Sequence, residues 1–154
     1  MVILCMIVRE AVTADIPQIQ VVRNLVKENP LPDPSLVTDA DCKDYLTNRG
    51  KGWVCEMGNR IVGFSIISVK DNNVWALFIQ PGYERQGIGR LLHDRMMNWY
   101  FTQTTETVWL GTAPGTRAEK FYEAAGWTKT GIRPNGEVRF EMSQSQWKSL
   151  MLPA

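Results

Sequence analysis

Apolar and polar positions divide this chain into short runs with two different patterns. Short apolar runs that end at turn residues predict strands, and apolar residues spaced three or four apart predict helices. The expected strands are 53–57, 60–69, 74–80, 107–111, 127–132 and 137–143, preceded by an apolar run, 1–8, that is expected to be a buried strand. The expected helices follow Thr13, Thr38 and Pro114, and a further one begins near Ile88.

The first helix is expected to start with Thr13 as its N-cap. Its buried face would then be formed by Ile16, Ile19, Val22 and Val26, which recur at helical spacing. The second helix is expected to follow Thr38 and to run through Cys42, Tyr45 and Leu46. Between these helices the proline-rich residues 30–34 read as a loop.

Two glycine-containing dipeptides predict hairpins. Gly58-Asn59 lies between the second and third expected strands, and Asn135-Gly136 lies between the last two. The fourth helix is expected to end at Gly126. The resulting order, βααβββαβαββ, predicts an α+β fold in three layers. Its mixed, mostly antiparallel central sheet would have about seven strands and about four flanking helices.

Size and composition fit one soluble domain spanning residues 1–154. A chain of 154 residues can bury about 70% of its unfolded surface. Its residues are 44% hydrophobic and 21% charged, as is ordinary for a globular protein. The net charge of +1 implies no general affinity for nucleic acid or for membranes, so any phosphate must be bound by a local site.

Cysteine and histidine are too few and too scattered for a zinc site or a disulfide scaffold. The chain has Cys5, Cys42, Cys55 and one histidine, His93, with no C-x-x-C pair. We therefore expect no metal and a reduced, cytoplasmic protein. The apolar run 1–8 lacks a basic region and a cleavage site and is too short to cross a membrane.

The segment from Leu77 to Leu92 carries the strongest chemical signal. It reads as strand, loop and helix, with Gly87 and Gly89 at the helix entry. Helix N-termini present unpaired N–H groups and a positive dipole end, so a phosphate is the expected ligand. The chain has no P-loop motif, and seven residues separate Ile79 from Gly87, which is too long for a dinucleotide turn. The alternative is that the glycines only permit a tight helix entry.

Two motifs together resemble the GCN5-related N-acetyltransferase (GNAT) family. The family's phosphate loop, Gln/Arg-x-x-Gly-x-Gly/Ala, is similar to Glu84 through Gly89, which follows the strand Leu77–Pro81. Its second motif, Ala-x-x-Phe/Leu-Tyr-x-x-x-Gly-Phe, is similar to Ala118 through Trp127. Glu84 departs from the pattern, because the family carries Gln or Arg there. The resemblance implies the acyl-CoA N-acyltransferase fold, with acetyl-CoA as the cosubstrate and no metal.

The resemblance also implies a set of site residues. The pyrophosphate of coenzyme A would lie on the loop formed by Arg85, Gln86, Gly87, Ile88, Gly89 and Arg90. The pantetheine and acetyl groups would lie along the backbone of Leu77, Phe78 and Ile79. Tyr122 would donate a proton, or a hydrogen bond, to the departing thiolate. The alternative for Tyr122 is an ordinary core tyrosine.

No general base is evident in the sequence. Many relatives carry a glutamate at one of two positions that are here Trp75 and Leu110. Three carboxylates, Asp71, Glu28 and Asp33, are unplaced alternatives, and a water chain could serve instead. His93 is expected at the surface or at an interface, and a homodimer stays an open alternative.

The leading functional hypothesis is an N-acetyltransferase that moves an acetyl group from acetyl-CoA to an amine of a small molecule or protein. The amine would attack directly in a ternary complex. A non-catalytic acyl-CoA sensor on the same fold is the alternative, and transfer to a hydroxyl or from another acyl donor is a third. The acceptor is expected near residues 30–37, where Trp53 and Trp75 could line its pocket.

Overall fold

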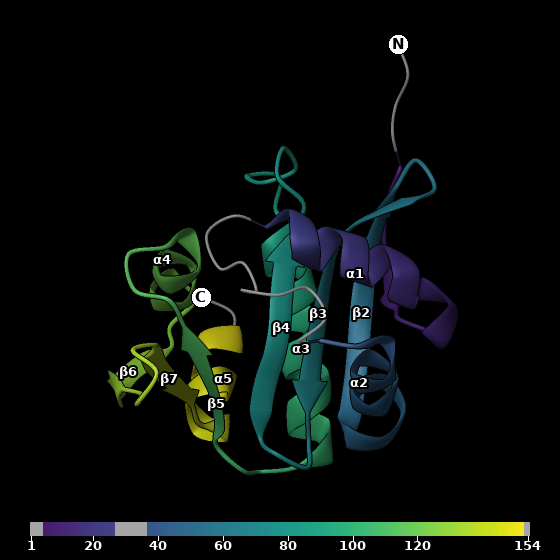
Figure 1. Ribbon diagram of the computed structural model, residues 1–154. Helices are drawn as coiled ribbons and strands as arrows, with labels where there is room; N and C mark the ends of the chain where they lie inside the picture. The colour runs from purple at the N-terminus through teal and green to yellow at the C-terminus, as the bar shows by residue number, and fades with distance from the viewer. Residues whose placement is uncertain (1–4, 27–36, 153–154) are drawn as a thin grey trace.

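A single seven-stranded sheet contains every strand of the described residues in the computed structural model (Figure 1). The structure describes residues 5–26 and 37–152. The strands lie in the order β1-β2-β3-β4-β5-β7-β6. Their bounds are β1 Met6–Glu10, β2 Gly50–Met57, β3 Arg60–Ser68, β4 Asn73–Ile79, β5 Val108–Thr112, β6 Thr128–Ile132 and β7 Val138–Met142. The helices are α1 Ile16–Leu25, α2 Asp39–Asp44, α3 Ile88–Gln103, α4 Arg117–Ala124 and α5 Gln144–Met151.

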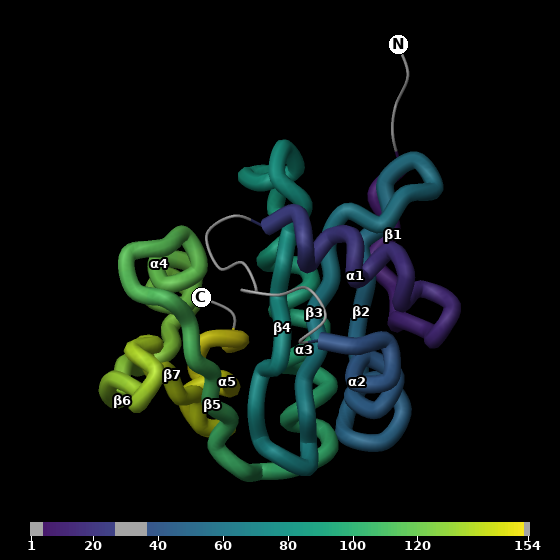
Figure 2. Tube along the Cα trace, in the orientation of Figure 1, coloured from purple at the N-terminus to yellow at the C-terminus, as the bar shows by residue number. Residues whose placement is uncertain are grey.

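Helices cover both faces of the sheet (Figures 1 and 2). On one face, Ile19 and Val22 of α1 pack with Phe64 of β3. On the other, Met96 of α3 and Trp147 of α5 belong to the larger core cluster. Neighbouring strands are antiparallel except β4 and β5, which are parallel. The predicted three-layer fold with a mixed, mostly antiparallel sheet is therefore confirmed.

Local sequence signals explain several boundaries. Gly58 and Asn59 have φ of 57° and 66°, as the tight turn between β2 and β3 requires. Thr38 caps α2, because its Oγ1 accepts from the Asp41 N–H at 3.1 Å while the Thr38 N–H donates to the Asp41 carboxylate. A π-helical turn, Tyr45–Arg49, then leads into β2. The predicted hairpin at Asn135-Gly136 joins β6 and β7.

The predicted cap of the first helix is wrong. Residues Thr13–Asp15 form a 3-10 turn whose N-cap is Val12, and α1 begins only at Ile16. The Val12 N–H donates to Asp15 Oδ2 at 2.8 Å, so Asp15 supplies the carboxylate cap. Arg9 holds Asp15 by two hydrogen bonds of 2.8 Å, and this pairing lowers the pKa of the Asp15 carboxyl.

Both ends of the sequence were predicted imperfectly. The first strand is Met6–Glu10, and it is partly exposed rather than buried because it lies at the edge of the sheet. Residues 1–4 of the predicted strand lie outside the described part. Helix α5 was missed, which brings the α-helices to five among the described residues. Its sequence is mostly polar, and Trp147 is its one buried residue. Its N-cap Ser143 accepts a hydrogen bond from the Gln146 N–H.

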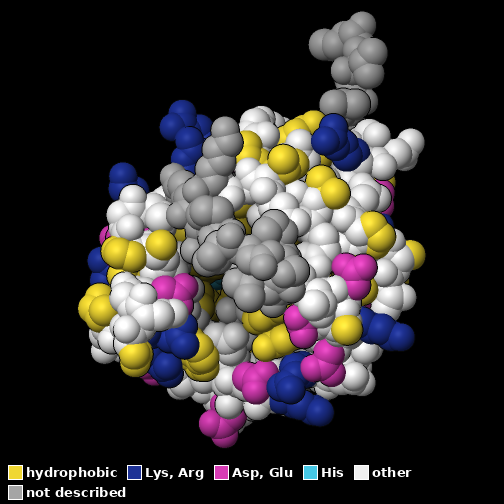
Figure 3. All heavy atoms as spheres, in the orientation of Figure 1, with side chains coloured by type: hydrophobic (Ala, Val, Ile, Leu, Met, Phe, Trp, Pro, Cys, Tyr) yellow, Lys and Arg dark blue, Asp and Glu magenta, His cyan; other side chains and the backbone are white. Residues whose placement is uncertain are grey.

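Opposite charges are intermingled on the face seen in Figure 3, and neither sign gathers into a large patch there. This distribution fits the net charge of +1. In the described ranges, no helix has both the length and the apolar character needed to cross a membrane.

Candidate active site

The sheet opens between β4 and β5. In the described part of the chain, the two strands pair only at their beginnings, where Asn73 lies opposite Trp109. The Trp109 N–H donates to the Asn72 carbonyl at 2.9 Å, and Asn73 Nδ2 donates to the Trp109 carbonyl at 3.2 Å. Beyond this point β4 stays paired with β3 as far as Ile79 opposite Gly63. One edge of β4 is therefore left to bind something other than a strand.

The register decides which backbone groups face this opening. The Gln80 N–H donates to the Val62 carbonyl on the β3 side at 2.7 Å. Backbone N–H groups of successive strand residues point to opposite edges, so the Phe78 N–H also faces β3. Leu77 and Ile79 then direct their N–H and C=O groups into the opening. Of the three residues proposed from the sequence, the geometry favours Leu77 and Ile79 as backbone ligands.

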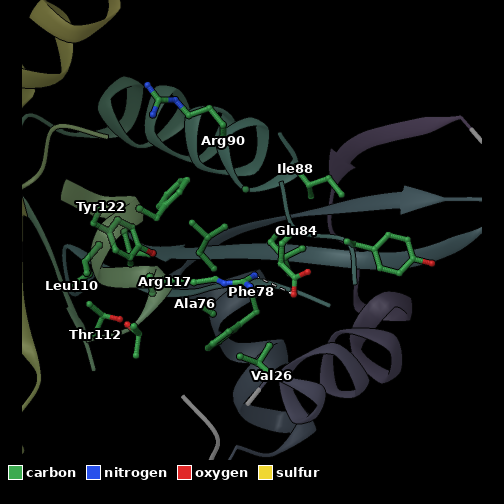
Figure 4. A pocket seen from close by; sticks show the side chains of 18 of the residues that line it. Val26, Ala76, Phe78, Glu84, Ile88, Arg90, Leu110, Thr112, Arg117 and Tyr122 are labelled. Atoms are coloured by element: carbon green, nitrogen blue, oxygen red, sulfur yellow. Dashed lines mark ion pairs between the residues drawn. The ribbon is translucent and has the colours of Figure 1, made fainter. Parts of the chain in front are cut away.

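A cavity of about 540 Å³ fills the opening between the two strands (Figure 4). One end, here called the glycine-loop end, is formed by Glu84, Arg85, Gly87, Gly89 and Arg90. The other end, here called the α1 end, is formed by Val26, Trp75 and Phe78. Tyr122 of α4 and Leu110 of β5 also line the cavity. A long ligand and a second, smaller one can therefore meet in this cavity.

The glycine-loop end presents backbone N–H groups in the arrangement that suits an anion. Helix α3 begins at Ile88, with Gly87 as an N-cap whose φ is 82° and which has no side chain to cap the helix. The first backbone bond of the helix runs from the Leu91 N–H to the Gly87 carbonyl, so the preceding N–H groups are left to a ligand. A Cβ on Gly87 would meet nothing within 4 Å, so glycine is favoured here by the left-handed backbone conformation and not by a close contact.

The side chains around this loop agree with a phosphate ligand. Arg85 and Arg90 line the glycine-loop end and supply positive charge. Arg90 also lies 3.5 Å from Asp94, one helical turn on. Gln86 belongs to the loop but is not among the residues that line the cavity.

The unusual Glu84 is used within the loop itself. Its Oε2 accepts from the Gly82 N–H at 2.9 Å, and its Oε1 lies 3.5 Å from Arg117 Nη1 (dashed in Figure 4). Hydrogen bonds from backbone N–H groups, its own and that of Gly82, hold the pKa of the Glu84 carboxyl below its ordinary value. The carboxylate is thus engaged by these donors, which offsets its charge near an anion site.

Tyr122 directs its hydroxyl into the cavity from α4 (Figure 4). The residue is 5% exposed, and its ring lies edge-on to Phe121 and to Trp127, with centroids 5.3 and 5.6 Å away. Burial raises the pKa of the Tyr122 phenol above its ordinary value. Its hydroxyl therefore stays protonated at neutral pH, so it can act as a donor.

His93 is not at the surface or at an interface, and that prediction was wrong. The side chain is fully buried behind Tyr122, among the rings of Phe121, Trp127 and Trp147. The Trp127 indole N–H, which can only donate, lies 3.0 Å from His93 Nε2. His93 Nδ1 must then carry the proton that is shared with Asp94 Oδ1 at 2.8 Å. The error follows from the missed helix α5, whose Trp147 covers the imidazole.

Of the three acidic candidates for a general base, Asp71 is described, and it does not line the cavity. Asp71 accepts from Ser68 Oγ at 2.8 Å and lies 3.2 Å from Arg49, in the turn before β4. Glu28 and Asp33 lie outside the described residues. Trp75 and Leu110, where relatives carry glutamate, do line the cavity. Among the described lining residues Glu84 is the one carboxylate.

Aromatic side chains dominate the α1 end, and one arginine lies behind them. Trp75 stacks on Tyr45, with centroids 4.0 Å apart and an interplanar angle of 7°. The Arg23 guanidinium lies 4.9 Å from the centre of the Trp75 ring and 5.0 Å from that of Phe78. Trp53 belongs instead to the core, edge-on to Trp99. Arg23 was not among the predicted site residues, although its position four residues after Ile19 places a charged side chain on the apolar face of α1.

Sites for a metal are not evident in the described ranges, where no three His, Cys, Asp or Glu residues cluster suitably. The three cysteines are free, with Cys5 exposed and both Cys42 and Cys55 buried.

Comparison with known proteins gives the family. The model of the Acetyltransferase (GNAT) family matches residues 19–127, which include the glycine loop, the opened strands and Tyr122. The chain belongs to the GNAT acetyltransferase family. It is an acetyl-CoA-dependent N-acetyltransferase, as the two sequence motifs implied. The family and the cosubstrate predicted from the sequence are thus confirmed.

Several acetyltransferases are similar to this chain in sequence or in structure. The [ribosomal protein bS18]-alanine N-acetyltransferase of Escherichia coli strain K12 is 25% identical over 99 residues, covering 60% of this chain and 67% of the relative. A crystal structure of that enzyme type from E. coli has a TM-score of 0.70 at 18% identity, covering 90% and 92% of the two chains. The PaiA N-acetyltransferase of Thermoplasma acidophilum, solved in complex with coenzyme A, has a TM-score of 0.77 at 11% identity, covering 90% and 99%. At these identities the two structures show a shared fold.

Proposed function

We propose that this GNAT acetyltransferase acetylates its amine acceptor by direct attack, with both substrates held together in the cavity between β4 and β5. The observation that carries the proposal is the opening itself. Its lining includes the glycine loop, the aromatic residues Trp75 and Phe78, and Tyr122, so the proposed anion site and the proposed acceptor pocket share one cavity. A ternary complex needs this arrangement, because the thioester and the amine must meet without a covalent enzyme intermediate.

Coenzyme A is proposed to enter from the glycine-loop end. Its pyrophosphate would accept from N–H groups at the start of α3, including those of Ile88 and Gly89, aided by the helix dipole. Arg85 and Arg90 line this end and would add charge-assisted contacts. The pantetheine amides would pair with the free edge of β4 at Leu77 and Ile79, as an added strand does.

Tyr122 is the proposed proton donor to the sulfur. Its hydroxyl points into the cavity, and burial keeps it protonated. When the amine attacks the thioester carbonyl, the carbon–sulfur bond breaks and the thiolate leaves. A hydroxyl within reach of this sulfur can supply a proton or a hydrogen bond.

The amine is proposed to lose its proton to water. No carboxylate other than the engaged Glu84 lines the cavity among the described residues. The enzyme would then bind the neutral fraction of the amine, or pass its proton along a chain of waters that leads to solvent.

An N-terminal alanine is one candidate acceptor, because the relatives in E. coli are named for alanine acetylation of a ribosomal protein. We further propose that the chain forms one domain and works in the reducing cytoplasm, which its three unpaired cysteines support.

The test is release of free thiol from acetyl-CoA in the presence of an amine panel that includes an alanine-starting peptide, free amino acids and polyamines. We expect at least one amine to be acetylated, and we expect acetyl-CoA, unlike NADH or ATP, to raise the melting temperature. A strong acetyl-CoA shift with no thiol release from any amine would favour the sensor. Equal shifts of the melting temperature with acetyl-CoA, NADH and ATP would contradict a specific coenzyme A site.

A further inference from the structure

Arg23 is buried without a hydrogen-bond partner for most of its donors. The residue is 8% exposed on α1, and its Nε and Nη2 atoms are buried with no partner among the described residues. Taking an arginine out of water costs free energy, and proteins normally offset this cost with a carboxylate or carbonyl oxygens. Desolvation lowers the pKa of Arg23 from its ordinary value, yet an arginine stays charged. A buried cation left unpaired in this way calls for an external partner.

The neighbours of Arg23 hold its side chain in place but leave its Nε and Nη2 groups without acceptors among the described residues. The rings of Trp75 and Phe78 lie 4.9 and 5.0 Å from the guanidinium carbon. Such cation–π contacts attract the charge but occupy none of the N–H groups. Cys42, the titratable group that senses the Arg23 charge, is buried, and burial raises the pKa of its thiol so that it stays neutral.

Arg23 is not itself a lining residue of the cavity, but it lies directly against two residues that are. Trp75 and Phe78 both line the α1 end, and so does Val26, which lies one helical turn after Arg23 (Figure 4). One turn before Arg23, Gln20 donates through Nε2 to the Val37 carbonyl at 2.8 Å, while its Oε1 is buried and unpaired. Behind the cavity wall, α1 thus carries buried donors of Arg23 and one buried acceptor of Gln20 that no described residue uses.

We propose that Arg23 binds a carboxylate of the acceptor, so that the preferred substrates are amines bearing a carboxylate near the nitrogen, as amino acids do. This inference rests on the proposed function, since it concerns the acceptor of the same cavity. A guanidinium donates two parallel hydrogen bonds to a carboxylate. One cation between two aromatic rings suits a planar group of one negative charge better than a phosphate, which carries more charge and needs more donors.

The first test compares pairs of acceptors that differ only in this group. Alanine and alaninamide, and phenylalanine and phenylalaninamide, are assayed by thiol release with wild type, Arg23→Met and Arg23→Lys. We expect wild type to show a carboxylate-to-carboxamide ratio of kcat/KM about tenfold above that of Arg23→Met. Because the ratio is compared between proteins, the different amine pKa values within each pair cancel. Arg23→Lys keeps the charge and is expected to keep part of the preference.

The second test needs no turnover. N-acetylphenylalanine and N-acetylphenylalaninamide, which resemble products, are added with coenzyme A, and the melting temperature is followed. With wild type, the carboxylate probe is expected to raise the melting temperature more than the amide probe does. With Arg23→Met, the two probes are expected to raise the melting temperature equally. Without ligand, Arg23→Met should melt at the wild-type temperature or above it, since an unpaired buried charge is removed.

The outcomes separate this inference from the function beneath it. If no amine is acetylated but the two probes still discriminate through Arg23, the proposed function fails and the carboxylate site stands. Equal shifts from the two probes in wild type, or a difference that survives in Arg23→Met, would overturn the carboxylate site. So would a lower melting temperature of Arg23→Met with unchanged probe discrimination, which would assign Arg23 to packing.

Discussion

The two ends of the cavity are built from different parts of the polypeptide. The glycine-loop end uses backbone N–H groups at the start of α3 and needs little from side chains beyond the glycines. The α1 end is formed by the side chains of Trp75 and Phe78, with Arg23 packed against both rings. A backbone site suits a ligand that many relatives share, whereas a side-chain site can change by single substitutions. The glycine-loop end is therefore proposed to bind the cosubstrate that the family shares. The α1 end is proposed to decide which amine this member acetylates.

The largest effect is expected where the two ends meet. Tyr122→Phe removes the hydroxyl that points into the cavity and keeps the ring that packs on Trp127. Turnover should fall by about 10- to 1,000-fold, with little change in coenzyme A affinity, as expected of one positioned proton donor. Steady-state kinetics and coenzyme A titration check this. Acetylation at the wild-type rate would make Tyr122 a core residue only.

Gly89→Val should disable the glycine-loop end alone. A Cβ at Gly89 would lie 3.6 Å from Phe121 and 3.9 Å from Ile79, which is ordinary contact, so Gly89→Ala should bind coenzyme A nearly as wild type does. The branches of valine would crowd the same space, and we expect the Kd for coenzyme A to rise about 10- to 100-fold. Calorimetric titration of the folded variants provides the measurement. Equal coenzyme A affinities of the valine and alanine variants would show that coenzyme A does not bind at this loop.

The pH profile tests the absence of a base at the α1 end. Below the pKa of the acceptor amine, its neutral fraction grows about tenfold per pH unit, and kcat/KM should follow. Because burial raises the pKa of Tyr122 above its ordinary value of about 10, its deprotonation should cause no decline below that pH. Initial rates between pH 6 and pH 10 provide the check. A plateau reached well below pH 7 would reveal a hidden carboxylate base.

The smallest effect is expected from one wall of the α1 end. Trp75→Leu removes a ring that stacks on Tyr45 at 4.0 Å and that faces Arg23. The acceptor KM should rise about three- to tenfold, the scale of one aromatic contact, while coenzyme A affinity stays unchanged. A matched loss of affinity for both substrates would mean that the two ends are not independent.

Much of the fold could be predicted because local signals fix it. Tight turns at Gly58-Asn59 and Asn135-Gly136 and the Thr38 cap leave marks in the sequence that tertiary contacts do not override. The cap at Thr13 could not be predicted, because the carboxylate of Asp15 caps that turn and depends on Arg9 from a neighbouring strand. Helix α5 was hidden because it buries a single large residue, Trp147.

The site was predictable in the same measure. The left-handed backbone at Gly87 favours glycine, so the sequence records the loop that is proposed to bind phosphate. The roles of His93 and Arg23 depend on which distant rings surround them, and helical spacing alone carries no such information. The choice between Phe78 and its neighbours required the register of β4 against β3, which no pattern of apolar residues specifies.

The position of β7 between β5 and β6 has a consequence for synthesis on the ribosome. Strand β6 leaves the exit tunnel first, yet it pairs with no described strand except β7, which follows it. Helix α5 comes later still, and its Trp147 packs on the His93 imidazole that fixes Trp127 behind Tyr122. Tyr122 therefore emerges before the elements that fix its surroundings. The glycine loop before α3 is synthesised earlier still, so the nascent chain completes that loop before it can hold Tyr122, the proposed proton donor, in place.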